Sequence, residues 1–349
     1  FFLDRYTNLY DRIAFDKLLI VDEAHNFANR ISVDLDNKYP YKLGLSATPV
    51  FGTDEEKTQN LLSWFGGQVV DLPIEKALGK YLVNYEYHPI FVQATDEDEK
   101  KFAKATALML SAIDPVRKII LDEEKFTLGY RGRLRAISMA EEKHERISEI
   151  FSHIQDKDHT IIYCSDGKSC FEGTPRVNAA EEIRHLEYIL HLINTSCLSS
   201  VGSGKASKFT ATEDIQERMQ LIDSFNKGYI EYLVAIRCLD EGINIPSIKS
   251  ALILSSNDNY REFVQRRGRI LRLYPNKEKA HIYDVIVLPS ILNKAFAQIE
   301  FRRYFEYSRL ALNKDILVDK LERLMSDYDL SYDDIKFNND YVYGGDLDD

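Results

Sequence analysis

Residues 17–25 read KLLIVDEAH, and this stretch gives the first indication of the fold. A short apolar run is typical of a buried β-strand, and two acids follow directly where that strand would end. Residues 41–48, YKLGLSAT, have the same form, with two hydroxyl side chains in place of the acids. Ligands of open α/β sheets bind beyond the carboxyl ends of the strands, so both segments predict a ligand site at that edge.

Five more apolar segments of strand length follow, and helical patterns separate them. The predicted strands are 86–95, 160–167, 231–237, 250–256 and 280–288, and the predicted helices are 179–194, 214–228 and 259–271. This alternation predicts an α/β fold built on parallel sheets with crossover helices. Residues 96–157 carry no strand signal, and RAISMAEEKHERISEIFSHI (135–154) predicts one long amphipathic helix. After Pro289 the pattern is helical again.

Composition excludes some classes of protein. The 349 residues are enough for two domains with full cores, and the sequence has no run of 18 apolar residues, so we expect no membrane span and no membrane partner. The N-terminal residues lack the basic-then-apolar order of a signal peptide. The cysteines are scattered, which disfavours a zinc site built on them and predicts a reduced, intracellular, cytoplasmic protein.

The charge is unevenly distributed. The net charge of −11 argues weakly against a nucleic-acid binder, but residues 326–349 alone carry eight aspartates and one lysine. Basic runs occur at 129–135, 265–272 and 301–305. A protein that grips a phosphate backbone needs a basic groove rather than a basic whole, so nucleic acid stays a candidate partner.

One segment resembles a phosphate-binding loop but fails its pattern. Residues 199–208 read SSVGSGKASK, whereas a P-loop reads G-x-x-x-x-G-K-[ST]. Ser199 stands where the first glycine belongs, and Ala206, which follows Lys205, has no hydroxyl for Mg²⁺. We interpret the segment as a Gly/Ser loop.

Two motifs lie in the N-terminal part. The adjacent carboxylates of Asp22 and Glu23 suit metal-assisted phosphoryl chemistry; the alternative is an acid pair that satisfies a helix dipole. Ser46 and Thr48 place two hydroxyls just after a strand; the alternative is an ordinary turn with a helix cap.

Two further motifs lie in the C-terminal part. Residues 240–246, DEGINIP, form a glycine-containing loop after a strand. Residues 265–272, QRRGRILR, place Arg269 and Arg272 three apart on one helical face, where their guanidinium groups could reach a γ-phosphate. The alternative is a solvated basic face.

In this order, VDEAH, SATP, EGINIP and QRRGRILR resemble the motifs of superfamily-2 helicases, in the DEAH-type branch that includes transcription-repair helicases and restriction-enzyme motor subunits. The resemblance covers about residues 18–290 and implies tandem RecA-like domains that use ATP and Mg²⁺. The implied parts are 1–95, the end of the first RecA-like domain; 96–157, a helical insertion; 158–290, the second RecA-like domain; and 291–349, a helical extension with an acidic tail.

The resemblance also implies residue roles in the first domain. Asp22 would bind Mg²⁺ through water, and Glu23 would activate the hydrolytic water. His25 would couple the ATP site to the second domain, and Ser46 and Thr48 would link hydrolysis to the grip on nucleic acid.

In the second domain, Gln265 would be the residue through which that histidine couples. Gly242 and Asn244 would lie near the ribose and the γ-phosphate, and Arg269 and Arg272 would be arginine fingers. Two positions depart from the family pattern: Asn244 stands where aspartate is frequent, and Ile236 stands where many members have a threonine that contacts the nucleic-acid backbone.

No G-x-x-x-x-G-K-[ST] pattern occurs in the chain, although the family carries one before the acidic motif. We therefore expect the first RecA-like domain to be incomplete, with an exposed sheet edge and an apolar face. A missing N-terminal segment or a second polypeptide would carry the P-loop.

The predicted function is an ATP-driven helicase or translocase. The expected track is DNA, duplex and without sequence preference, because phosphate contacts carry no sequence information. One alternative is an RNA helicase, although Gln265 at the start of the last motif resembles the DNA-acting branch more than the DEAD-box RNA helicases. The other is a non-hydrolysing, motor-like scaffold or binding subunit.

Overall fold

The computed structural model describes residues 17–31, 39–49, 55–117, 119–154, 158–169, 183–195, 206–210, 213–236, 244–255 and 260–335. The described chain divides into two compact units, one up to Leu72 and the other from Pro73 onward. Gly242 and the acidic tail beyond residue 335 lie outside the described residues.

The first unit contains a two-stranded parallel sheet and two helical segments. β1 (Leu18–Val21) pairs with β2 (Tyr41–Gly44) from Leu18↔Tyr41 to Val21↔Gly44. η1 (Ala24–Arg30), a 3₁₀ helix, follows β1, and α3 (Glu55–Trp64) comes later. Both strands lie where the sequence predicts them.

The burial of these two strands differs from the prediction. Their outer apolar side chains are about half exposed: Leu18 57%, Ile20 58%, Tyr41 57% and Leu43 47%. Side chains alternate between the faces of a strand, so one face of this short sheet is more open to solvent than the other. Parallel strands are normally covered on both faces, so the half-exposed apolar side chains distinguish this sheet from a fully covered one.

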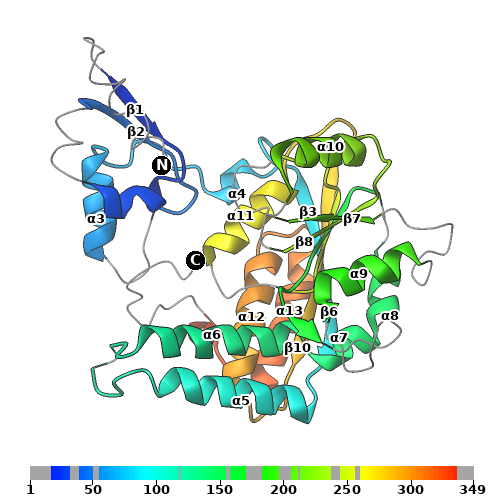
Figure 1. Ribbon diagram of the computed structural model, residues 1–349. Coiled ribbons are helices and arrows are strands. Elements are labelled where there is room, and N and C mark those ends of the chain that lie inside the picture. Colours follow the sequence, from blue (N-terminus) through cyan, green and yellow to red (C-terminus); the bar gives the residue numbers. More distant parts are fainter. Residues whose placement is uncertain are drawn as a thin grey trace. The chain divides into compact units, whose positions relative to one another are not determined.

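The second unit is built on a six-stranded parallel sheet with helices on both faces (Figure 1). The strand order is β3-β10-β9-β4-β8-β7, which confirms the predicted α/β class. The strands are β3 (Asn84–Gln93), β10 (Lys279–Leu288), β9 (Ser250–Ile253), β4 (Thr160–Tyr163), β8 (Tyr232–Ala235) and β7 (Ala206–Phe209). A small antiparallel pair, β5 (Lys168–Ser169) and β6 (Ile183–Arg184), accompanies it.

Two apolar cores cover the two faces of this sheet. The first contains residues of α10 (Ile215–Asn226), α11 (Tyr260–Ile270), α12 (Lys294–Ser308) and α13 (Lys314–Asp327). The second contains residues of α5 (Asp96–Leu110), α6 (Glu123–Ser138), α8 (Ile147–Ser152) and α9 (His185–Asn194). The remaining short helices are α4 (Ile74–Ala77), α7 (Glu141–Glu145) and α14 (Tyr332–Ile335).

The structure differs from the predicted boundaries at residues 95 and 290. β3 pairs with β10 over ten positions, from Lys279↔Asn84 to Leu288↔Gln93, so it belongs to the second unit rather than to the end of the first. The reason is packing, because Tyr85 and Tyr87 are fully buried in the core under α12 and α13. These two helices contribute core residues and are integral to the second unit, not an appendage.

Two local predictions were also wrong. The long helix predicted over 135–154 is three pieces, α6, α7 and α8, because Ala140 has extended torsions (φ −55°, ψ 135°) and ends the helical path. The Gly/Ser loop predicted at 199–208 ends in β7, which pairs with β8 at the sheet edge. None of the helices within the described ranges has the length and apolar character needed to cross a membrane.

Candidate functional site

In the first unit, backbone hydrogen bonds fix the two loops that follow β1 and β2. The amide of Leu45 donates to the carbonyl of Val21 (2.8 Å), and the amide of Ala24 donates to the carbonyl of Leu45 (2.8 Å). These bonds join Leu45, one residue past β2, to the last residue of β1 and to Ala24, three residues past β1. As a result, the acids of the first motif and the hydroxyls of the second share one edge of the sheet.

His25 connects these two motifs. Its Nδ1 lies 2.9 Å from Ser46 Oγ and 3.4 Å from Glu23 Oε2. Ser46 Oγ also accepts a hydrogen bond from the amide of Thr48 (3.2 Å). The imidazole is only 4% exposed, so these contacts are shielded from solvent. The structure therefore brings four of the predicted site residues, Glu23, His25, Ser46 and Thr48, into one connected cluster.

The two adjacent acids, Asp22 and Glu23, differ in exposure: Asp22 is exposed and Glu23 is half-buried. The carboxylate of Asp22 accepts a hydrogen bond from the amide of Glu23 (3.0 Å). Glu23 has left-handed torsions (φ 48°, ψ 53°), a region that non-glycine residues seldom adopt and that is enriched at functional sites. An exposed carboxylate beside one oriented by a histidine fits a magnesium ligand next to a general base.

In the second unit, the predicted phosphate-binding residues meet at the end of α11. Arg272 Nη1 donates a hydrogen bond to Asn244 Oδ1, which joins two of the predicted site residues directly. Burial and the neighbouring positive charge of Arg269 lower the pKa of Arg272 from its ordinary value. Two guanidinium groups that repel one another are stabilised by an anion of high charge density, such as a polyphosphate.

The residues of the basic run 265–272 differ in burial and therefore in their expected roles. Arg266 and Arg267 are 2% and 0% exposed. Arg266 pairs with Glu262 and stacks 4.1 Å over the Tyr163 ring, and Arg267 donates to the carbonyl of Glu306. These two arginines hold α11 against the core, so the alternative of a wholly solvated basic face is wrong for them. Gln265, Arg269 and Arg272 are half-buried and remain accessible to a ligand.

Lys277 is a residue of this cluster that the sequence did not reveal. Its Nζ donates to the carbonyls of Ile270 (2.6 Å), Arg272 (3.0 Å) and Pro246 (3.3 Å). The side chain is 7% exposed and connects the last turn of α11 to the loop that carries Asn244. A cation after a helix C-terminus is a known capping signal, and this is the feature of the sequence that could have identified it.

If the chain hydrolyses ATP as its motifs predict, Lys277→Met should lower turnover without changing the fold. Without the three carbonyl contacts, the end of α11 and the Asn244 loop lose their fixed spacing, and displacements of about 1 Å at a catalytic group can cost about a hundredfold in rate. The measurement is ATP turnover by the P-loop-bearing form of the protein, and circular dichroism checks the fold. The control is Lys249→Met, which removes a lysine whose Nζ lies 3.6 Å from Asp158 Oδ2. Wild-type turnover in the Lys277 variant would contradict this positioning role.

The comparisons with known proteins agree with this geometry. Residues 142–274 match the family model described as the Helicase conserved C-terminal domain. The match includes β4, β7, β8 and β9 of the second unit and both sides of the Asn244–Arg272 contact.

Two curated relatives are DNA motor proteins by their names. The DNA 3'-5' translocase XPB2 of Sulfurisphaera tokodaii is 24% identical over 273 residues, which cover 73% of this chain and 55% of that protein. The putative DNA 3'-5' helicase Rad25 of Haloarcula marismortui is 24% identical over 282 residues, 77% of this chain and 35% of that protein. The chain thus spans about half or less of the length of these relatives.

A solved structure shares the fold. A fragment of a putative HsdR subunit of a type I restriction enzyme from Vibrio vulnificus superposes with a TM-score of 0.50 and 16% identity, over 81% of this chain and 50% of that one. The chain is thus similar to helicases and translocases in sequence, and it shares its fold with the restriction-enzyme fragment.

Proposed function

We propose that this chain forms part of an ATP-dependent DNA helicase or translocase of the DEAH-type branch of superfamily 2. The observation that carries the proposal is the cluster of Glu23, His25 and Ser46, where a buried imidazole contacts both a candidate base and a hydroxyl. A strand end that served only the fold would not require this connection. Residues 142–274, which match the helicase C-terminal domain, would form the second half of the same motor.

Each of these residues would have a separate role in ATP hydrolysis. Glu23 would accept a proton from the attacking water, with His25 holding its carboxylate. Asp22 would hold Mg²⁺ through water, and the ion would neutralise charge on the phosphates. Arg269 and Arg272 would stabilise the charge that develops on the γ-phosphate, with Asn244 orienting Arg272. Gly242 would lie near the ribose.

A further part of the motor would supply the P-loop, either from a segment of the same protein or from a second polypeptide. The half-exposed side chains of Leu18, Ile20, Tyr41 and Leu43 support this proposal, because parallel sheets are stable when helices cover both faces. Added strands and a covering helix would bury this apolar surface.

DNA is the proposed track, and direct binding tests it. We expect the chain with its P-loop part to bind labelled duplex DNA in fluorescence anisotropy, with affinity falling by about 10³-fold between 50 and 200 mM salt if six or more phosphates are contacted. Binding should not depend on base sequence. Absence of binding at low salt would overturn the proposal, and stronger binding and stimulation by RNA would favour the RNA helicase alternative.

Glu23→Gln separates a motor from a non-hydrolysing scaffold. The amide keeps the shape of the side chain but cannot accept the proton of the attacking water, so we expect turnover to fall by about 10²-fold or more, as for the loss of a general base. DNA binding should persist, which serves as the internal control. Unchanged DNA-dependent function in the Glu23 variant would favour the scaffold instead.

A further inference from the structure

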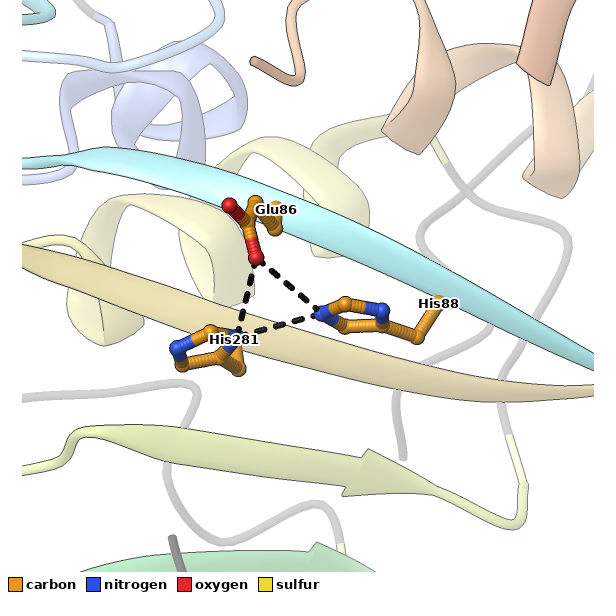
Figure 2. Close-up of side chains that lie close together, drawn as sticks. All are labelled: Glu86, His88 and His281. Carbon is orange, nitrogen blue, oxygen red and sulfur yellow. Dashed lines mark hydrogen bonds and ion pairs between the residues drawn. The ribbon is translucent and has the colours of Figure 1, made fainter. Parts of the chain in front are cut away.

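A second cluster of ligand-type side chains contains none of the residues proposed to act on ATP. Glu86 and His88 come from β3, and His281 comes from β10 (Figure 2). His88 Nε2 lies 3.1 Å from His281 Nδ1 and 3.7 Å from Glu86 Oε2, and His281 Nδ1 lies 3.6 Å from the same oxygen. The cluster is near the amino ends of both strands, and Arg272 lies beside the same end of β3, because it forms a β-bridge with Leu82.

The register of the parallel strands creates this arrangement. His281 is paired with Glu86, and Tyr283 is paired with His88, so all these side chains share one face of the sheet. The His88 ring stacks on the Tyr283 ring (centroids 4.7 Å apart) and on the His281 ring (5.4 Å). This stacking orients both imidazoles, so the cluster is held by the sheet and does not depend on mobile surface side chains.

The three atoms have the spacing of ligands around one ion. Zinc bonds to imidazole nitrogen and carboxylate oxygen at about 2.0–2.2 Å, so tetrahedral ligand atoms lie about 3.3–3.5 Å apart. The observed separations of 3.1, 3.6 and 3.7 Å bracket that range. A single ion above the triangle reaches all three atoms with small side-chain movements.

Charge and burial also suit a cation. The other carboxylate oxygen of Glu86, Oε1, pairs with Lys279 Nζ (2.7 Å), which leaves Oε2 directed at the two imidazoles. His281 is 6% exposed and His88 is half-buried. Two imidazole nitrogens and a carboxylate oxygen are ligand types that one divalent ion can bind together.

We propose that Glu86, His88 and His281 form a binding site for a divalent transition metal of the zinc class. The site has two nitrogen ligands and one oxygen ligand, and water would complete the tetrahedron. The ion would clip β3, the edge strand of the six-stranded sheet, to β10 at their amino ends. This proposal does not depend on ATP hydrolysis, and it is tested by metal binding alone.

The test is a titration of the metal-stripped, untagged chain. Co²⁺ is added first, because tetrahedral Co²⁺ with nitrogen and oxygen ligands gives visible absorption, and Zn²⁺ is then used to displace it. We expect one metal ion to bind per chain. His88→Gln and His281→Gln should each weaken Zn²⁺ binding by about a hundredfold or more, a larger loss than is usual for a residue that only hydrogen-bonds a metal ligand. Zn²⁺ should also raise the melting temperature of the wild type and not of these variants.

Two controls keep the result interpretable. His153→Gln, at an exposed histidine next to α8, should bind Zn²⁺ like the wild type. Circular dichroism checks the fold of the variants; if His281→Gln unfolds, the more exposed His88 carries the comparison. Absence of stoichiometric binding by the wild type, binding unchanged in His88→Gln, or equal loss in His153→Gln would each overturn the proposal.

Discussion

Arg272→Ala is expected to lower ATP turnover by about 10³-fold or more, the magnitude associated with an arginine finger. The Arg272 side chain is half-buried and donates a hydrogen bond to Asn244. The positive charge of Arg269 repels it, so an anionic phosphate would be a favourable ligand. The measurement is steady-state turnover by the P-loop-bearing form of the protein at saturating DNA. DNA affinity should change little, because the loss is in the chemical step.

Matched variants make this expectation specific. Arg272→Lys keeps the charge but loses the planar fork, so it should restore only a small part of the activity. Arg323→Ala, at an exposed position on α13, should behave like the wild type. Full turnover in Arg272→Ala would remove this residue from the catalytic machinery.

Arg303→Met is expected to lower the free energy of unfolding by about 3–5 kcal/mol, the usual cost of breaking a buried ion pair. Arg303 Nε lies 3.0 Å from Asp284 Oδ2, its Nη1 lies 2.6 Å from Glu300 Oε1, and both carboxylates are fully buried. Burial opposes the charge of Arg303, but the two carboxylates outweigh it and raise its pKa. Without the guanidinium group, two buried carboxylates lose the cation that contacts both of them, and the electrostatic interaction with Lys143 remains.

Denaturant unfolding of the full chain measures this effect. Tyr87 also donates to Asp284 (2.9 Å), so the change should reach β3 as well as β10 and α12. Arg323→Met, which removes an exposed arginine, should change the free energy by no more than about 0.5 kcal/mol. A loss below about 1 kcal/mol in Arg303→Met would show that the carboxylates are accommodated without their partner.

Much of the fold could be predicted because apolar runs define parallel strands. All seven predicted strands exist, and three helices lie within the predicted ranges. β7 was missed because its sequence, ASKF, contains no apolar run and follows a glycine- and serine-rich segment. The sequence of β3 does not say which sheet it joins, because its pairing with β10, nearly 200 residues later, decides this.

Some residues of the candidate site could be predicted from the sequence, and others could not. The motifs themselves identified Glu23, His25, Ser46 and Thr48, and the structure joins them through local contacts. Their catalytic roles remain predictions, as do those of Asn244, Arg269 and Arg272. Lys277 and the cluster of Glu86, His88 and His281 could not be predicted, because carbonyl contacts and cross-strand register determine them.

ATP turnover by the P-loop-bearing form of the protein, with and without duplex DNA, tests the central claim most directly. We expect turnover that duplex DNA stimulates and that Glu23→Gln abolishes. Single-stranded DNA and RNA, added in parallel, identify the preferred track. A protein that contains the P-loop and still hydrolyses no ATP with any nucleic acid, or one whose turnover is the same in Glu23→Gln, would contradict the account.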